Sequence, residues 1–261
     1  MKISVNGVEL NVREEGDPKG APVVFANSLG TDLTLWDGVV PLLPSGLRLI
    51  RYDKRGHGQS ECPDAPYTMG ALVTDLELLL DHLQVQSSVI VGCSIGGLIA
   101  QGLAVKRLDQ VRAIVLSNTA CKIGTKDMWR ERIEAVENGG IEALADATME
   151  RWFSRKFRET SDPDHWRALM TSQPKQGYLG CMAAISGTDF FTPTSGLTLP
   201  TLAIAGSEDG STPPDLVRET AELIRGSRFE LMRGAGHLPM VEKPREYADL
   251  ITEFLKEVGH V

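Results

Sequence analysis

The chain has 261 residues, of which 42% are hydrophobic and 24% charged, a balance typical of a globular protein with a sizeable core. Its formal net charge is −8 and its lysines and arginines form no basic run, so a small-molecule substrate is a better expectation than nucleic acid or an anionic membrane. The N-terminus has no apolar signal segment, no apolar run reaches the roughly 18–20 residues of a spanning helix, and the four cysteines show no CxxC spacing. We therefore expect a cytoplasmic protein with reduced thiols and neither a zinc site nor a disulfide framework.

A hairpin and a series of buried strands are predicted along the chain. Residues 1–5 and 8–14 alternate polar and apolar side chains around Asn6-Gly7, a strong signal for a two-residue turn. Short unbroken apolar runs are typical of strands buried on both faces of a parallel sheet. Such runs occur at 23–26, 47–52, 88–91, 111–116, 201–205 and 228–232.

Helical segments separate these strands. Residues 70–83 carry apolar side chains at the spacing of an amphipathic helix, and 95–106, 213–224 and 244–257 are further predicted helices. Strands that alternate with helices imply right-handed crossover connections. The predicted fold class is α/β, with a mostly parallel sheet covered by helices on both faces.

One stretch breaks the alternation. Between about 121 and 195 there is no convincing buried strand. The helix-like segments there are 126–138, 141–152, 162–171 and 176–185. We interpret this stretch as a helical lid inserted into the core. The predicted division is 1–120 for the first part of the core, 121–195 for the lid and 196–261 for the second part of the core.

The run Gly92-Cys93-Ser94-Ile95-Gly96 carries the clearest chemical signal. It lies between a predicted strand and a predicted helix, which is the context of the Gly-x-Ser-x-Gly nucleophile elbow. A serine on so tight a turn needs small residues two positions before and after it, and both are glycine. A plain glycine-rich turn is the alternative, but the context favours Ser94 as a nucleophile whose oxyanion is stabilised at a helix N-terminus.

A serine nucleophile needs a base and a group that orients the base. In proteins with this nucleophile elbow, the three residues follow one another along the chain in the order serine, acid, histidine. Asp209 follows the predicted strand 201–205, and His237 follows the strand 228–232 in a loop of small residues. Glu208 competes for the role of the acid. We prefer Asp209, because its side chain is shorter and a glycine follows it.

Two backbone N–H groups are needed to bind the tetrahedral intermediate. Ile95, directly after the nucleophile, supplies one, and Leu29, in the loop after the strand 23–26, is the best assignment for the other. The side chains of Asn27 and Ser28 in that loop are candidates for substrate contact.

The remaining histidines have plainer expected roles. His82, His165 and His260 are expected to be ordinary surface residues, and His57 to brace its own loop.

The chain resembles the α/β-hydrolase superfamily nearly from end to end. The resemblance rests on the elbow, on Tyr52-Asp53-Lys54-Arg55-Gly56-His57-Gly58-Gln59-Ser60 and on Gly234-Ala235-Gly236-His237. Together with the first loop, Asn27-Ser28-Leu29-Gly30-Thr31-Asp32, and with Asp209-Gly210-Ser211-Thr212-Pro213-Pro214, it extends to the 3-oxoadipate enol-lactonases. Cys93 and Ile95 depart from residues common in relatives, at positions that leave the chemistry unchanged.

The resemblance implies hydrolysis of 3-oxoadipate enol-lactone to 3-oxoadipate in the breakdown of aromatic compounds, through an acyl-enzyme and without a metal or organic cofactor. The substrate carries a free carboxylate, which calls for a cationic partner. The predicted lid offers Lys122, Arg130, Arg132 and Arg151, with Trp129 and Trp152 as possible flat walls. For each of these residues alone, a solvated or core position is the simpler expectation.

Other functions remain open on the same frame. A carboxylesterase, a perhydrolase or a C–C hydrolase would use the same three residues. A receptor that keeps the pocket without turnover is a more distant alternative, and its mark would be ligand binding that survives Ser94→Ala.

Overall fold

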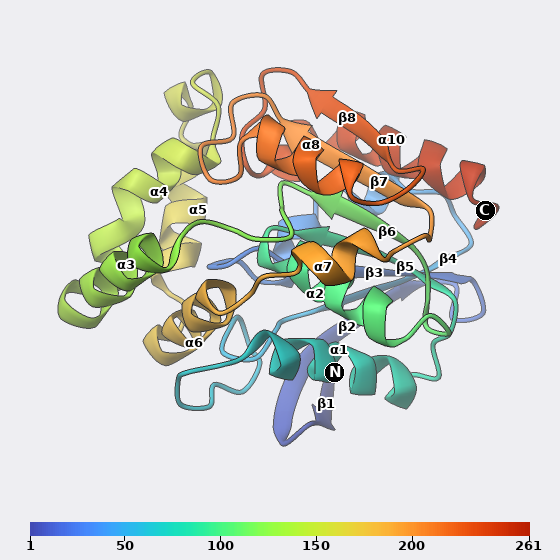
Figure 1. Cartoon of the computed structure of the whole chain (residues 1–261), viewed down its shortest axis with the longest axis horizontal. Helices are drawn as coiled ribbons and strands as arrows, with labels where there is room; N and C mark the ends of the chain where they lie inside the picture. The colour runs from blue at the N-terminus through green and yellow to red at the C-terminus, as the bar shows by residue number, and fades with distance from the viewer.

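The computed structural model describes all 261 residues as a single eight-stranded sheet flanked by helices (Figure 1). The strands are β1 (Lys2–Val5), β2 (Val8–Gly16), β3 (Ala21–Ala26), β4 (Leu47–Tyr52), β5 (Ser88–Cys93), β6 (Val111–Ser117), β7 (Thr201–Gly206) and β8 (Arg228–Met232). They are arranged in the order β1-β2-β4-β3-β5-β6-β7-β8. The β1–β2 and β2–β4 pairs are antiparallel and all the others are parallel. Every predicted strand is confirmed, as is the α/β class.

The predicted hairpin joins β1 to β2 at one edge of the sheet. Asn6 and Gly7 have φ angles of 48° and 73°, so both central residues lie in the left-handed region. This is the geometry of a type I′ turn, whose twist matches that of the two strands. Asn tolerates such a φ and Gly does so without cost, which explains why this pair predicted the turn.

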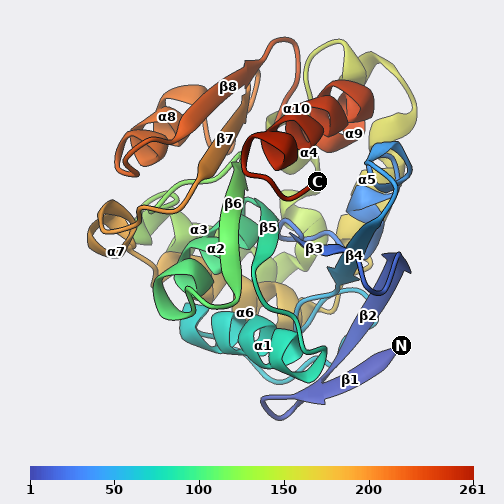
Figure 2. The ribbon, with the colours of Figure 1, turned by 90° about the vertical axis from the view of Figure 1, so that its right-hand side faces the viewer.

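Helices cover both faces of the sheet. They are α1 (Met69–His82), α2 (Ile95–Lys106), α8 (Pro214–Glu222), α9 (Pro239–Glu242) and α10 (Pro244–Glu257). Figure 2 shows α1, α2 and α8 on one side of the sheet and α9 and α10 on the other. The predicted helices are confirmed to within two residues at each end, whereas the four-residue α9 is too short to show periodicity.

Between β6 and β7 the chain forms helices and no strand. They are α3 (Lys126–Gly139), α4 (Ala145–Trp152), α5 (Asp162–Thr171), α6 (Lys175–Ser186) and the short α7 (Phe191–Ser195). The helix predicted over 141–152 is divided, because Ile141–Leu144 forms a 3-10 turn before α4 begins. In Figure 1, α3 to α6 lie together at one end of the sheet. No helix of the chain is both long and apolar enough to cross a bilayer.

The parallel strands point their carboxyl ends toward these helices. The loop 27–32 follows β3, Ser94 follows β5, Asp209 follows β7, and His237 lies beyond β8. Because the carboxyl ends of parallel strands meet at one edge of a sheet, residues far apart in sequence are gathered there.

Shortening a buried leucine of α1 tests the packing of this helix. Leu76 is fully buried, whereas Leu78 on the same helix is 37% exposed. We expect Leu76→Ala to lower the free energy of unfolding by about 2–5 kcal/mol, because it leaves a cavity. The matched variant Leu78→Ala should change it by less than about 1 kcal/mol. Urea unfolding followed by circular dichroism measures both; equal losses would contradict this placement of α1.

Candidate active site

Ser94 lies on a tight turn between β5 and α2. Its φ and ψ angles are 56° and −118°, a conformation that non-glycine residues rarely adopt. A Cβ atom at Gly92 would overlap the carbonyl oxygen of Gly96, and one at Gly96 would overlap the carbonyl oxygen of Ala26. The two glycines are therefore required for α2 to begin this close to β3 and β5, and they leave the Ser94 side chain on the wall of a cavity.

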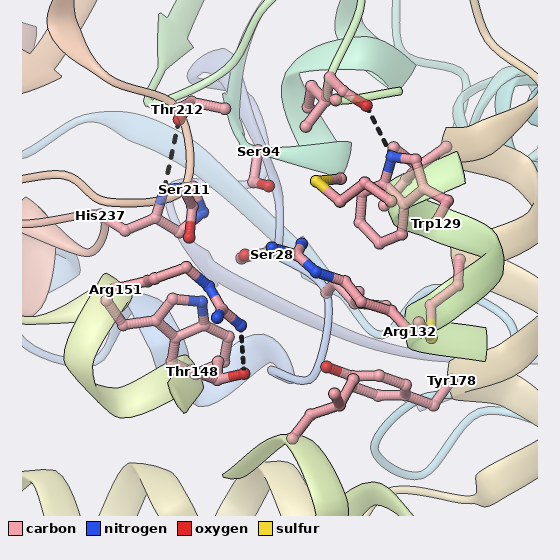
Figure 3. A pocket seen from close by; sticks show the side chains of 18 residues that line it. Ser28, Ser94, Trp129, Arg132, Thr148, Arg151, Tyr178, Ser211, Thr212 and His237 are labelled. Carbon is pink, nitrogen blue, oxygen red and sulfur yellow. Dashed lines mark hydrogen bonds between the residues drawn. The ribbon is translucent and has the colours of Figure 1, made fainter. Parts of the chain in front are cut away.

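His237 and Asp209 form a buried pair beside Ser94. Nδ1 of His237 lies 2.8 Å from Oδ2 of Asp209, and His237 lines the same cavity as Ser94 (Figure 3). The backbone N–H of His237 donates to the carbonyl oxygen of Trp152 at 2.7 Å, and the two rings stack with centroids 6.5 Å apart. Trp152 at the end of α4 thus holds the histidine from one side while Asp209 holds it from the other.

Asp209 is held in its ionised form. Burial opposes ionisation, but the neighbouring His237 and hydrogen bonds from Asn118 and Ser211 outweigh it and lower the pKa of the carboxyl. Asn118 Nδ2 and Thr212 Oγ1 each donate to Oδ2 at 2.8 Å, while the Ser211 and Thr212 N–H groups donate to Oδ1 at 2.7 and 3.0 Å. An acceptor-only carboxylate suits this ring of donors.

Glu208 is directed elsewhere. Its Oε2 accepts from the backbone N–H of Arg155 at 2.9 Å, and its side chain is partly exposed. Of the two acids considered for orienting His237, only Asp209 is in contact with it.

Two contacts of Asp209 were not anticipated from the sequence. Asn118 follows β6, between the strands that carry Ser94 and Asp209, and the polar run Ser117-Asn118-Thr119 at this strand end was a usable signal. Thr212 Oγ1 donates to Asp209 and lies 3.3 Å from His237 Nδ1. No sequence spacing indicated its contact with both groups.

Neither of the two N–H groups expected to bind an oxyanion, those of Leu29 and Ile95, donates a hydrogen bond within the protein. Leu29 lines the cavity and its N–H donates no hydrogen bond within the protein. Ile95 is the first residue of α2, so its N–H has no acceptor within the helix. Ser28 Oγ is buried on the cavity wall without a hydrogen-bond partner. Asn27 does not line the cavity: its amide donates to Tyr52 O at 2.8 Å and accepts from Trp36 Nε1 at 2.7 Å.

The cavity wall carries two arginines and no carboxylate. Its apolar part includes Trp129, Trp152 and Met182, whereas the charged part consists of Arg132 on α3 and Arg151 on α4 (Figure 3). Neither guanidinium forms an ion pair with a carboxylate of the chain: Arg132 lies over the Trp129 ring at 5.3 Å, and Arg151 Nη2 donates to Thr148 Oγ1 at 2.9 Å.

Burial lowers the pKa of both arginines, and repulsion from Arg151 lowers that of Arg132 further. Arginine nevertheless stays protonated near neutral pH, so the cavity is cationic within an acidic protein. The other two cations considered for carboxylate binding face solvent, Lys122 paired with Asp189 at 2.8 Å and Arg130 with Asp127 at 2.9 Å.

Of the remaining histidines, His82 and His165 are exposed as expected. His260 is not a surface residue: it is 8% exposed and its Nε2 lies 3.0 Å from the carbonyl oxygen of Pro22, because the C-terminus folds back along the start of β3. His57 is buried and accepts a hydrogen bond from the N–H of Gly30, so it braces the neighbouring loop 27–32.

Comparison with known proteins identifies the family of the chain. Residues 21–244 match the family model described as the alpha/beta hydrolase fold. The chain belongs to the α/β-hydrolase family. It is 34% identical to 3-oxoadipate enol-lactonase 1 of Acinetobacter baylyi over 97% of this chain and 95% of that protein. The crystal structure of the enol-lactonase from Burkholderia xenovorans superposes with a TM-score of 0.94 at 34% identity, covering 98% of this chain and all of that one.

A thermophilic esterase from Thermogutta terrifontis, solved with malate bound, is also similar to this α/β-hydrolase. Its TM-score is 0.93 at 27% identity, with each chain covered completely. Relatives of this fold therefore include both lactonases and esterases.

The unpaired arginines predict that this α/β-hydrolase binds small dicarboxylates. Succinate is expected to raise the melting temperature by mass action relative to sodium chloride at equal ionic strength, because each carboxylate can pair with a guanidinium. Arg132→Gln and Arg151→Gln should each reduce the shift. Arg130→Gln, on the solvent side of the same helix as Arg132, is the matched control and should leave it unchanged. A full shift in the Arg132→Gln/Arg151→Gln double variant would place the binding elsewhere.

Proposed function

We propose that this protein is a serine hydrolase that converts 3-oxoadipate enol-lactone to 3-oxoadipate. The observation that carries the proposal is the joint occurrence, in one cavity, of Ser94, His237 and two arginines without acidic partners. This is the combination that an ester with a free carboxylate requires. The 34% identity to a 3-oxoadipate enol-lactonase over nearly the whole chain supports the same substrate.

In the first half of the reaction, Ser94 Oγ attacks the lactone carbonyl while His237 accepts its proton. Asp209 keeps Nδ1 of His237 protonated, so that Nε2 is free to act as the base. The negative charge that develops on the carbonyl oxygen is stabilised by the N–H groups of Leu29 and Ile95. Collapse of the tetrahedral intermediate breaks the ring C–O bond, and the enolate, which stays attached to the acyl chain, takes the proton from His237 and becomes the ketone.

In the second half, His237 activates a water molecule that attacks the acyl group on Ser94. The acyl–oxygen bond breaks, the proton returns to Ser94, and the second carboxylate of the product is released. The sum is lactone plus water giving 3-oxoadipate, and it requires no cofactor.

The substrate carboxylate pairs with Arg132 or Arg151. Loss of a charged hydrogen bond typically costs about 1.5–3 kcal/mol, so these residues contribute substantially to substrate binding. In this proposal residues 121–195 act as a lid on the core formed by 1–120 and 196–261, and the lid supplies the selectivity while the core supplies the nucleophile and the base.

The rate of enol-lactone loss, followed by its ultraviolet absorbance, tests the substrate. We expect a kcat/KM of at least about 10⁴ M⁻¹ s⁻¹ and a fall in kcat of at least about 10³-fold in Ser94→Ala, because the nucleophile is removed. If the lactone persists while p-nitrophenyl acetate is cleaved in a Ser94-dependent way, the protein is a serine hydrolase but the proposed substrate is wrong.

The same assay includes a control for carboxylate recognition. Arg132→Gln should raise the KM for the lactone roughly tenfold or more, and leave the KM for the neutral p-nitrophenyl acetate within about twofold. An equal rise for both substrates would contradict a role in charge recognition.

Replacement of the orienting acid distinguishes Asp209 from its neighbour. Asp209→Asn is expected to lower kcat by about three to four orders of magnitude, because an amide N–H would face donor groups and favour the wrong tautomer of His237. Glu208→Gln, the matched control, should lower kcat by less than about threefold, since Glu208 does not touch His237. Comparable losses in the two variants would reject this assignment.

A further inference from the structure

Lys54 is a buried cation without a carboxylate partner. Its side chain is almost entirely shielded, with the residue 2% exposed, and it takes part in none of the ion pairs of the protein. Its Nζ donates instead to two carbonyl oxygens of the loop after β3, that of Ser28 at 2.6 Å and that of Thr31 at 3.2 Å. An unpaired buried ammonium is costly, so its presence beside this loop calls for an explanation.

The Ser28 carbonyl and the Leu29 N–H belong to one peptide group. Lys54 therefore binds the oxygen end of the peptide whose nitrogen end is the proposed oxyanion donor. A cation on a carbonyl oxygen draws electron density from the amide and makes its N–H a stronger hydrogen-bond donor. The same contact fixes the direction in which that N–H points.

We propose that Lys54 is a positioning residue that orients and polarises the Ser28–Leu29 peptide group and so strengthens the oxyanion hole. The inference rests on the proposed function, because it concerns the Leu29 N–H in that reaction. Lys54 does not line the cavity, so it acts through the peptide and not on the substrate.

Other side chains hold the same loop and allow this effect to be separated from folding. Nε2 of His57 accepts from the N–H of Gly30 at 3.0 Å, and Oδ1 of Asp53 accepts from the N–H of Leu33 at 2.7 Å. With these two contacts in place, a neutral residue at position 54 leaves the loop anchored while it removes the charge.

The protonation of Lys54 gives the inference a pH signature. Burial lowers the pKa of Lys54 to about 8, and the nearby carboxylates of Asp53 and Asp32 oppose that shift. The amine is charged below this pH and neutral above it, so the oxyanion hole should weaken as the pH rises through about 8.

The other titratable groups around Lys54 do not change charge in this range. Burial raises the pKa of Cys181 to about 12 and that of Cys93 well above its ordinary value. Burial and the Lys54 charge lower the pKa of His57 well below its ordinary value, so His57 is neutral there. Asp53 and Asp32 are the facing carboxyls; burial raises the pKa of Asp53, and hydrogen bonds from Gln59, Asn11 and Leu33 oppose that rise.

The experiment measures kcat and KM between about pH 6.5 and 9 for wild type, Lys54→Gln and Lys54→Arg, with the rate of Ser94→Ala subtracted as background. Lys54→Gln keeps a donor for the Ser28 carbonyl but no charge. It should lower kcat about tenfold to a hundredfold with KM within about twofold, and lose the alkaline decline seen in wild type. Lys54→Arg, whose charge does not titrate here, should recover part of kcat and show no decline. Lys122→Gln, a surface lysine, is the matched control.

Several results would overturn the inference. One such result is a kcat in Lys54→Gln equal to that of wild type. Another is a lower kcat that comes together with a higher KM, a lower melting temperature and an unchanged pH profile, because this combination marks a purely structural role. If the variants do not fold, a wild-type kcat that stays level up to about pH 9 overturns it. An absence of Ser94-dependent hydrolysis in wild type, with the lactone or with p-nitrophenyl acetate, overturns the proposed function itself.

Discussion

The close approach of α2 to β3 and β5 is the constraint on which the site depends. Because Gly92 and Gly96 carry no side chain, the helix begins directly against the Ala26 carbonyl group. This places the N–H of Ile95 at the positive end of α2 and beside the loop that follows β3. A bulkier residue at either glycine would push the helix away and separate that N–H from Leu29. One steric requirement thus sets the strained conformation of Ser94 and the close approach of α2 to the end of β3.

The cations of the protein interior fall into two groups, those paired with a carboxylate and those without one. Arg51 and Arg55 are buried in ion pairs with carboxylates, which offset the cost of removing them from water. The half-buried Arg132 and Arg151 and the fully buried Lys54 lack such partners, and all three lie around the same site. For the arginines the missing anion is the substrate carboxylate of the proposed function. For Lys54, carbonyl oxygens of Ser28 and Thr31 take the place of a carboxylate partner. In our inference, this contact polarises the Ser28–Leu29 peptide group.

The sequence predicted those features that follow from backbone geometry. Each of Ser94, Asp209 and His237 follows a predicted strand in the sequence. The carboxyl ends of parallel strands meet at one edge of a sheet, whatever the packing of the surrounding helices. The side chains of the helices between β6 and β7 were less predictable, since Arg130 and Arg132 are two residues apart on α3 and only tertiary packing decides which faces the cavity. Asn27 was considered for substrate contact, but nothing local shows that Trp36 and Tyr52 occupy its amide.

Helix α6 and the loop 27–32 share one support. Gly177 of α6 packs so closely on Gly56 that a Cβ at either position would overlap the other's backbone, and the Tyr178 ring stacks near His57 with centroids 6.3 Å apart. His57 in turn holds the N–H of Gly30. Movement of α6 relative to the loop 53–58 would therefore disturb both the wall of the cavity and the loop that carries Leu29. In the proposed function, substrate recognition by residues 121–195 and charge stabilisation by the core are therefore mechanically linked, because both depend on this backbone-to-backbone contact.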